Sequence, residues 1–407
     1  MPNEHATGTR RLRGEAVIAC ALASAFLLLS TARTQAQQAD VSSLWVNDNK
    51  GDDNATGDRA HPLKSISVAL SKLSEPLLHG VTIHWAGGTI LSSGGRWMLP
   101  DRLQLMLRML PSAGVRIVGE PNEAGALPVL AFRGDPLVDV VEGNWWLENL
   151  QIGNGNYACG LRATGPGVVR LSNVTFRIYT NSGCAIQARR GGLVELSGAI
   201  KINEHLHDQA PPDSFASIVA EYSGIVRYVD SDHSSLDMGN GQLSTSYYGV
   251  IELGAKDVRV TSWGGQSNCV AINDSGRIDF HGSTIRLCAR LKGNTPVGLE
   301  DDGHVLGEGA HLIIEGDNNN AIVLQKNSAF GCTTVELRGP IRTAVSAMSG
   351  STFHGGFLGD IGSVDVDTGA CVAIGEVQGR ITGQVTAIRG GTVVLPGGKV
   401  IFGQGGL

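Results

Sequence analysis

Residues 184–202 read CAIQARRGGLVELSGAIKI, and this stretch decides the fold. Apolar side chains alternate with polar ones on both sides of the central RRGG. A period of two is typical of a β-strand with one buried face, and a glycine pair between two such runs is typical of a tight turn. The stretch therefore predicts a strand, a turn and a second strand, with Val194 facing inward and Glu195 facing outward, where a substitution would be nearly silent.

The same pattern returns at other places along the chain. Its aliphatic positions align with aliphatic residues 25 positions upstream, which places Leu161, Ala163, Val169 and Leu171 on Ile186, Ala188, Val194 and Leu196. Further copies lie within residues 249–253, 270–282 and 385–395. One such unit cannot close a hydrophobic core alone, so the copies must stack on one another. Wider spacings at residues 203–214 and 291–303 predict loops that leave the stack.

Composition agrees with many short strands. Glycine makes up 56 of the 407 residues, which is about twice the usual share of roughly 7%. The glycines are spread over turn positions rather than clumped, and this favours strands over disorder. Aromatic residues (5%) and charged residues (17%) are too few for a coiled coil or a basic nucleic-acid binder, so no nucleic-acid partner is expected.

Residues 1–36 have the features of a cleavable export signal. Arg10, Arg11 and Arg13 form a basic segment, and residues 16–29 are apolar but short for a membrane span. We expect cleavage after Ala36 and a secreted, periplasmic or cell-surface protein with no stable membrane anchor. A twin-arginine signal and an uncleaved anchor are the alternatives. The signal carries four arginines and two glutamates, so its removal changes the formal charge from −6 to −8 and disfavours bulk attraction of anionic polymers.

Two of the six remaining cysteines occupy equivalent positions of neighbouring repeats. Cys159 and Cys184 are 25 residues apart, so we expect them on adjacent coils of the stack. They are interpreted as small buried side chains, and a disulfide between them is the alternative.

The N-terminal part of the mature chain, residues 37–80, differs from the repeats in 81–407. Trp45 and Val46 predict a short strand, and residues 47–58 predict a loop because Asn, Asp and Gly dominate them. After Pro62, an apolar stripe predicts an amphipathic helix that covers the open end of the stack, formed by Ile66, Ala69, Leu70 and Leu73.

The N-terminal residues and the later repeats resemble those of a known superfamily. The pattern Trp45-Val46, Gly51-x-Asp53-x-x-x-Gly57, Pro62-x-x-x-Ile66-x-x-Ala69-Leu70 resembles the start of right-handed parallel β-helix proteins of the pectate-lyase-like superfamily. The later Gly-Gly-x-Val-x-Leu units resemble its bacterial and prophage tail-spike-like members. The resemblance implies an all-β, right-handed parallel β-helix solenoid with a short N-terminal capping helix, and spike-like relatives imply a homotrimer as one assembly. The superfamily contains lyases, hydrolases and non-catalytic adhesins, so the function stays open.

The first candidate site surrounds Asp230 and Asp232. On a strand these two side chains would share one face, which suits a calcium ion or an acid–base pair. The resemblance implies that β-elimination needs a calcium-bridged uronate and a basic residue, and Arg227 lies nearby as a substrate-binding candidate. The superfamily's signature around that base is absent here, and an exposed polar turn is the alternative.

The second candidate site contains Asp301, Asp302 and His304. Adjacent carboxylates can separate their pKa values, so that one stays protonated and serves as a general acid. The polygalacturonase branch of the superfamily has a paired-aspartate element and a histidine element, but its other signatures are missing from this chain. A solvated loop is the alternative.

Two further groups of residues are weaker candidates for a functional site. Residues 204–208 read EHLHD, and their two histidines could share a metal ion, although a third ligand is not evident. Trp145 and Trp146 could stack on sugar rings, and their adjacency on a strand means that one of them faces outward.

Two hypotheses from different classes follow. In the first, the protein is exported and binds or cleaves an extracellular or cell-envelope polysaccharide, with Ca²⁺ as the one cofactor considered. In the second, it is a non-catalytic structural or adhesive rod. The polysaccharide hypothesis depends on the resemblance, whereas the missing lyase and hydrolase signatures favour the rod.

Overall fold

The computed structural model describes residues 42–73, 75–87, 103–122, 125–130, 136–155, 159–178, 183–204, 215–230, 232–263, 268–290 and 293–403. The predicted export signal, 1–36, lies outside these residues. Within the compact unit Leu44–Leu407, most of the secondary structure that is described is β-structure; the described helices include the short helix α2 (Ile66–Ser71) and the 3₁₀ turn η2 (Pro396–Gly398). No helix in the described ranges is long and apolar enough to cross a membrane.

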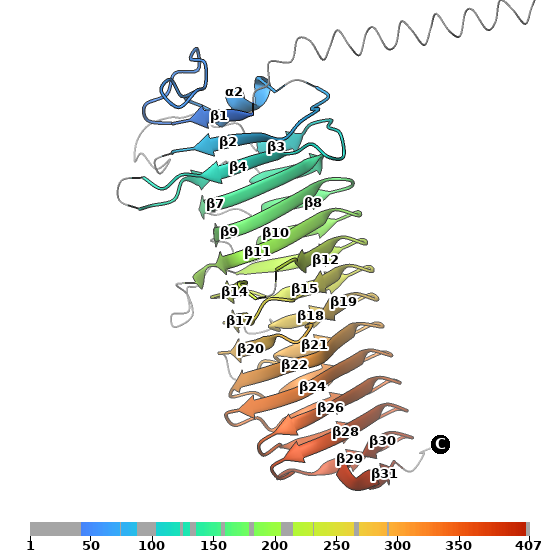
Figure 1. Ribbon diagram of the computed structural model, residues 1–407. Helices are drawn as coiled ribbons and strands as arrows, with labels where there is room; N and C mark the ends of the chain where they lie inside the picture. The colour runs from blue at the N-terminus through green and yellow to red at the C-terminus, as the bar shows by residue number, and fades with distance from the viewer. Residues whose placement is uncertain are drawn as a thin grey trace, which may run out of the picture. The chain divides into compact units, whose positions relative to one another are not determined.

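The described strands form two sheets (Figure 1). The 12-stranded sheet contains β3 (Leu103–Met106), β6 (Val138–Glu142), β8 (Cys159–Thr164), β10 (Gly183–Arg189), β12 (Ala216–Glu221), β15 (Leu243–Ser246), β18 (Val270–Ile272), β21 (Val297–Leu299), β23 (Asn320–Leu324), β25 (Thr343–Ala347), β27 (Ser363–Val366) and β29 (Val385–Ala387). The 19-stranded sheet contains β1 (Ser43–Val46), β2 (Val81–Trp85), β4 (Val115–Gly119), β5 (Val129–Leu130), β7 (Asn144–Gly155), β9 (Val168–Ile178), β11 (Leu193–Ile202), β13 (Ile225–Tyr228), β14 (Ser235–Met238), β16 (Val250–Glu252), β17 (Asp257–Ser262), β19 (Arg277–Asp279), β20 (Thr284–Ala289), β22 (His304–Gly316), β24 (Ala329–Arg338), β26 (Thr352–Leu358), β28 (Cys371–Gln378), β30 (Thr392–Val394) and β31 (Val400–Phe402).

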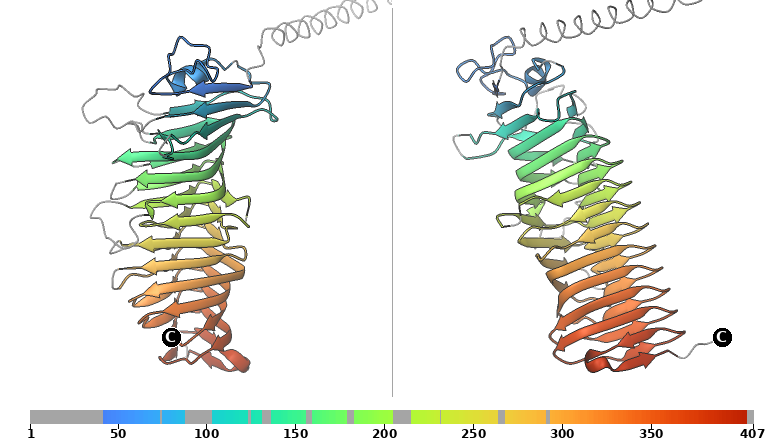
Figure 2. Two further views of the ribbon diagram at one scale, coloured as in Figure 1. Left: turned by 60° about the vertical axis from the view of Figure 1, so that its left-hand side comes forward. Right: turned by 45° about the vertical axis from the view of Figure 1, so that its right-hand side comes forward.

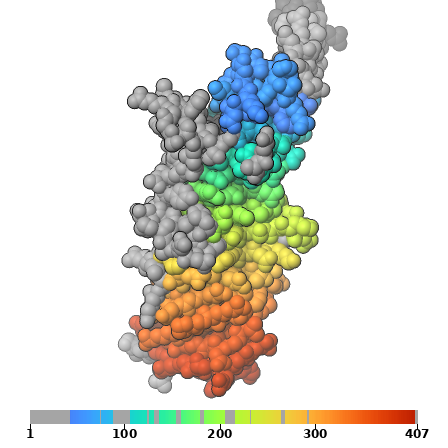
Figure 3. Space-filling view, turned by 90° about the vertical axis from the view of Figure 1, so that its left-hand side faces the viewer, coloured from blue at the N-terminus to red at the C-terminus, as the bar shows by residue number. Residues whose placement is uncertain are grey.

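The chain alternates between the two sheets as it advances. Each repeat contributes one strand to the 12-stranded sheet, and then either one bent strand, such as β11, or two short strands, such as β13 and β14, to the other. Each strand pairs in parallel with its counterpart from the next repeat, and Figures 2 and 3 show these repeats stacked in chain order. The last pair, β30 with β31, is antiparallel. The predicted all-β parallel fold is therefore confirmed.

The register that the repeats predict is confirmed. Leu161 pairs with Ile186 and Ala163 with Ala188 in one sheet, while Val169 pairs with Val194 and Leu171 with Leu196 in the other. All eight side chains are fully buried in one continuous hydrophobic core. One predicted loop is wrong in part: residues 291–303 include β21, because Val297 and Leu299 face the core with Gly298 between them.

One corner of the stack is built from left-handed backbone. Where a strand of the 12-stranded sheet turns into the next strand, two consecutive residues have positive φ angles, for example Arg190 and Gly191 at 51° and 80°. Successive turns bond to each other, since the amide of Ser223 donates to the carbonyl of Tyr247 at 3.0 Å. We call this column the left-handed corner; its turns are Arg190–Gly191, Tyr222–Ser223, Tyr247–Tyr248, Asp274–Ser275, Asp301–Asp302, Lys326–Asn327, Ser349–Gly350, Thr368–Gly369 and Arg389–Gly390.

Local contacts explain the N-terminal pattern. A Cβ at Gly51 would lie 2.2 Å from the carbonyl oxygen of Leu63, so only glycine fits there. Asp53 accepts hydrogen bonds from the amides of Lys64 and Ser65, and Ser65 caps α2 by accepting from the Val68 amide at 3.3 Å. Helix α2 begins after Ser65 rather than at Pro62, and it buries Ile66 and Ala69. Its role as a cap of the stack stays a prediction.

Asp48 makes the stability of this region depend on pH. Burial raises the pKa of Asp48 from 3.8 to about 6, although the Trp85 indole donates to the carboxylate at 3.1 Å. The unfolded chain therefore loses this proton first as the pH rises, so the contribution of Asp48 to stability is complete below pH 3.8 and is lost by about pH 6. We expect the free energy of unfolding to fall by about 2 kcal/mol across this window.

The Asp48→Asn variant tests this prediction by urea unfolding between pH 4 and pH 6. The neutral amide cannot ionise, so the difference in stability between the variant and the natural protein should grow with pH. Asp52→Asn, at an exposed neighbouring carboxylate, is the control and should leave the slope unchanged. Parallel pH profiles for Asp48→Asn and the natural protein would contradict the assignment.

Cys159 and Cys184 are directly paired across β8 and β10, as the repeats predict. Their Sγ atoms lie 2.6 Å apart, and neighbouring parallel strands hold Cα atoms at a separation that a disulfide can span. Both side chains are thiols in the structure, with Cys159 buried and Cys184 half-buried.

We predict that oxidised glutathione converts this pair to a disulfide. Each thiol gives up its hydrogen, and the glutathione disulfide is reduced to two thiols in exchange. Non-reducing peptide mapping of the mature chain should recover the peptides of Cys159 and Cys184 linked, and Cys184→Ser should abolish the linked species. Cys332 should remain a thiol, because burial raises its pKa to about 11. Recovery of both cysteines as unlinked peptides would show the prediction to be wrong.

Candidate functional site

The outward face of the 19-stranded sheet carries a row of charged and aromatic side chains on seven consecutive strands. Parallel pairing places each residue beside the next. Neighbouring strands lie about 4.8 Å apart, so the row is about 29 Å long. We call it the charged ladder; it consists of Arg116 (β4), Trp146 (β7), Arg170 (β9), Glu195 (β11), Arg227 (β13), Glu252 (β16) and Asp279 (β19).

The centre of the charged ladder is a carboxylate held by two guanidinium groups. Oε2 of Glu195 lies 2.5 Å from Nε of Arg170, and Oε1 lies 2.5 Å from Nη2 of Arg227. Glu195 is only 6% exposed although it faces outward, because the longer side chains of its neighbours cover it. Glu195 faces outward as predicted, but its burial argues against the prediction that its substitution would be nearly silent.

Trp146 lies on the charged ladder, and Trp145 does not. The guanidinium of Arg170 lies 4.7 Å from the centre of the Trp146 ring, and this side chain is partly exposed. Trp145 faces the core, is 2% exposed and donates from Nε1 to the carbonyl of Glu142 at 2.8 Å. One of the two tryptophans faces outward as predicted, and the suggestion that Trp145 binds substrate is corrected by its burial.

The other end of the charged ladder is acidic. Glu252 and Asp279 are direct neighbours on β16 and β19. Asp279 is 4% exposed, and its Oδ2 lies 2.5 Å from Nη2 of Arg277 and 3.3 Å from Nε2 of His281. Carboxylates on neighbouring strands are one way to assemble the paired acids of a glycosidase. Here Arg277 holds Asp279 as an ion pair.

Asp230 and Asp232 do not share the face of a strand. Strand β13 ends at Tyr228, and both aspartates lie exposed in the loop before β14. His233 approaches Asp230 at 4.0 Å. The predicted strand geometry is wrong, because the chain leaves the sheet before it reaches the first aspartate. Their catalytic role stays a prediction without that support.

Asp301 and Asp302 form one turn of the left-handed corner, so neither lies on a strand. Nε2 of His304, the first residue of β22, lies 3.5 Å from Asp302, and Lys326 lies 3.2 Å from Asp301. The hydrogen bonds that Lys326 donates to Glu300 and Asp301 raise the pKa of Lys326. The three predicted residues are therefore brought together, but on an exposed corner rather than in a cleft.

The structure gives little support to the predicted metal site. His205, His207 and Asp208 lie outside the described residues. Within the part of the chain that the structure describes, no group of three or more His, Cys, Asp and Glu side chains is placed to hold a metal ion.

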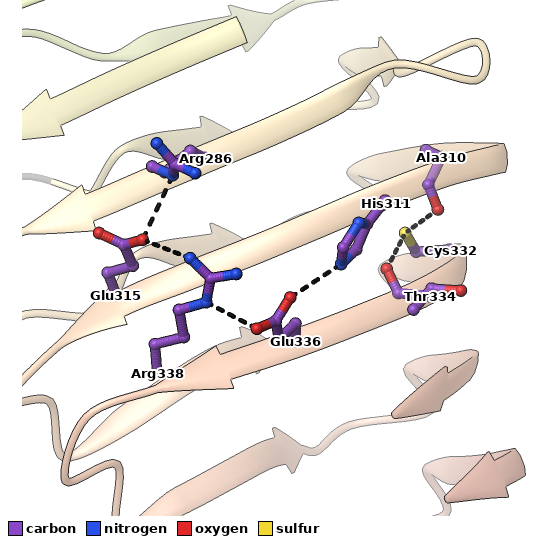
Figure 4. A network of polar contacts seen from close by, with 8 residues as sticks. All are labelled: Arg286, Ala310, His311, Glu315, Cys332, Thr334, Glu336 and Arg338. Carbon is purple, nitrogen blue, oxygen red and sulfur yellow. Dashed lines mark hydrogen bonds and ion pairs between the residues drawn. The ribbon is translucent and has the colours of Figure 1, made fainter. Parts of the chain in front are cut away.

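A second polar network lies on β20, β22 and β24 (Figure 4). Glu315 contacts Arg286 and Arg338, each at 3.3 Å. Arg338 continues to Glu336 at 2.6 Å, and Glu336 to His311 at 3.1 Å. The hydrogen bond from Arg338 is the main cause that lowers the pKa of Glu336. Because these charges neutralise one another, the network is best understood as a surface that stabilises three neighbouring strands.

Sequence reasoning found Trp146 and Arg227 but missed the rest of the charged ladder. The missing signal is the residue between the two inward positions of each repeat, as in VRI, WWL, VRL, VEL, VRY, IEL and IDF. Aligning these triplets by their inward residues would have revealed the row of charged and aromatic side chains.

The comparisons with known proteins gave few matches. No known protein family matches the chain, and no curated protein matches it. Among solved structures, the selenomethionine derivative of a GH136 lacto-N-biosidase from Eubacterium ramulus matches at 11% identity over 88% of this chain and 68% of that chain, with a TM-score of 0.40. The native form of that protein matches at 10% identity over 84% of this chain and 66% of that chain, with a TM-score of 0.31. The resemblance to the pectate-lyase-like superfamily stays a prediction.

Proposed function

We propose that the protein is exported and binds an extracellular or cell-envelope polysaccharide along the charged ladder. The observation that carries the proposal is the row of Arg116, Trp146, Arg170, Glu195 and Arg227, which parallel pairing places side by side on one outward face. Guanidinium groups donate several hydrogen bonds in a plane, and an outward tryptophan offers a flat apolar face to a sugar ring. A row of regularly spaced groups is suited to a polymer with a repeating unit.

The proposal includes the finer architecture. We propose that the chain winds as a right-handed parallel β-helix, because connections between parallel strands of one sheet are right-handed in nearly all known cases. We also propose, from the sequence, that the protein forms a homotrimer and that it requires calcium. Sedimentation of the mature chain, residues 37–407, tests the first, and the glycan screen below tests the second.

The screen measures retention of the mature chain on immobilised uronic-acid and neutral polysaccharides, with and without calcium. Retention on at least one glycan is the expected result. Product that absorbs in the ultraviolet would identify a lyase, and new reducing ends would identify a hydrolase. If no glycan retains the protein and no product forms, the proposal fails and the structural or adhesive rod replaces it.

The Trp146→Ala variant links the binding to the charged ladder. Loss of one stacking face should weaken retention about fivefold, because such contacts are worth about 1 kcal/mol and every 1.4 kcal/mol is a factor of ten. The control is Phe402→Ala, which removes a 72% exposed aromatic ring from β31. Equal retention of both variants would place the binding site elsewhere.

A further inference from the structure

Three tyrosines occupy the left-handed corner where other turns carry small or polar residues. Tyr222, Tyr247 and Tyr248 have φ angles of 49°, 49° and 64°. This conformation is unfavourable for a bulky side chain and is the usual place of glycine. Burial does not compensate for it, because the three side chains are 45%, 44% and 70% exposed. Strained, exposed aromatic residues are a reason to look for a function.

The tyrosines form a strip along the corner. The rings of Tyr222 and Tyr247, on successive turns, stack with their centres 4.6 Å apart and their planes inclined by 7°. Tyr248 follows in the same turn as Tyr247 and is the most exposed of the three. The strip therefore exposes apolar ring surface to solvent and is not part of the hydrophobic core.

A pocket with arginines lies beside this strip. Its volume is about 200 Å³, and its lining consists of Asp139, Val141, Arg162, Thr164, Arg189 and Arg190. The guanidinium of Arg189 lies 5.9 Å from the centre of the Tyr222 ring, so it joins the pocket to the strip. The pocket is lined by three arginines and Asp139, and Glu221 pairs with Arg189, so the cations outnumber the carboxylates at this place in an acidic protein.

The two arginines at the corner differ in their partners. Nε of Arg189 is buried and forms an ion pair with Oε1 of Glu221 at 3.5 Å. Arg190 is exposed and forms no ion pair with any residue that the structure describes.

We infer that Arg189, Arg190, Tyr222, Tyr247 and Tyr248 form a binding site for an anionic sugar chain, which we call the corner site. The tyrosine rings pack against sugar rings, and the guanidinium groups bind a carboxylate or sulfate substituent. This inference rests on the proposed polysaccharide function and deepens it, because it names an acidic glycan as the ligand. The corner site includes turns of the left-handed corner, and the charged ladder lies on the strands of the 19-stranded sheet.

The test is calorimetric titration of the mature chain with oligogalacturonate, dextran sulfate and neutral dextran. Binding of an acidic glycan at least tenfold tighter than neutral dextran, and weaker at high salt, is expected. A preference for oligogalacturonate identifies the carboxylate, and a preference for dextran sulfate identifies the sulfate. Equal affinity for neutral dextran would overturn the inference.

The variant Tyr248→Gly separates function from folding. Glycine suits this backbone better, so the melting temperature should hold or rise while affinity for the acidic glycan falls about tenfold. Arg190→Gln should likewise reduce affinity and remove most of the salt dependence. The matched controls are Asn327→Gly, at the equivalent turn position to Tyr248, and Arg389→Gln, at the equivalent position to Arg190; both should bind normally.

The outcomes distinguish the two proposals. If no glycan binds at all, the proposed function and the corner site both fail. If a glycan binds and Trp146→Ala weakens it while Tyr248→Gly and Arg190→Gln do not, the corner site alone is wrong.

Discussion

The Val194→Asp variant is expected to lower the free energy of unfolding by about 4 kcal/mol or more. Val194 is fully buried on β11, directly between Val169 on β9 and Val226 on β13. A carboxylate at this position would have apolar neighbours on both adjoining strands, and burying an unpaired charge or its protonated form is unfavourable. Urea unfolding of the mature chain measures the loss.

The control for this variant is Val229→Asp, the same substitution at a residue that is 55% exposed. It should change stability by less than about 0.5 kcal/mol, as surface substitutions usually do. Equal stability of the two variants would mean that Val194 does not face the core, and the inward assignment of every repeat would fail with it.

The Glu195→Ala variant is expected to destabilise the protein by about 3 kcal/mol. Glu195 is the shared partner of Arg170 and Arg227, so its removal leaves two guanidinium groups close together without the carboxylate between them. Removal of one partner of a buried ion pair usually costs about 3–5 kcal/mol. The low end of this energy range applies here. The side chains of Arg170 and Arg227 are 34% and 43% exposed, so water can partly replace the carboxylate.

A double-variant cycle makes this prediction specific to the ion pair. Adding Arg170→Ala to Glu195→Ala should cost less than the sum of the two single changes, since one of the opposed cations is then absent. Glu308→Ala, at an exposed glutamate on β22, should be nearly neutral. If Glu195→Ala lowers the free energy of unfolding no more than Glu308→Ala does, the carboxylate of Glu195 contributes little to the stability of the stack.

The sequence predicted the inward side of the fold well. A period of two identifies which residues face the core, and the 25-residue repeat aligned Leu161 with Ile186 and Val169 with Val194 as the structure does. This works because each repeat must bury the same positions against its neighbours.

The outward side was harder to predict, for a physical reason. Alternation shows that Glu195 points away from the core, but it does not show that Arg170 and Arg227 cover it from adjacent strands. Exposure there depends on contacts between repeats that are far apart in the sequence. The left-handed turn at Tyr247 and Tyr248 was missed for a related reason: neither residue is of a type that favours it.

The antiparallel strand β31 has a consequence for self-association. A parallel stack leaves its final strand with a free row of amide and carbonyl groups, which is a template for edge-to-edge polymerisation. β31 occupies that edge on β30 in the reverse direction and is three residues long. Strand β31 therefore removes the parallel template at β30, whereas β29 stays the edge strand of the 12-stranded sheet, so edge-to-edge addition of a second molecule is expected at β29 rather than at β30.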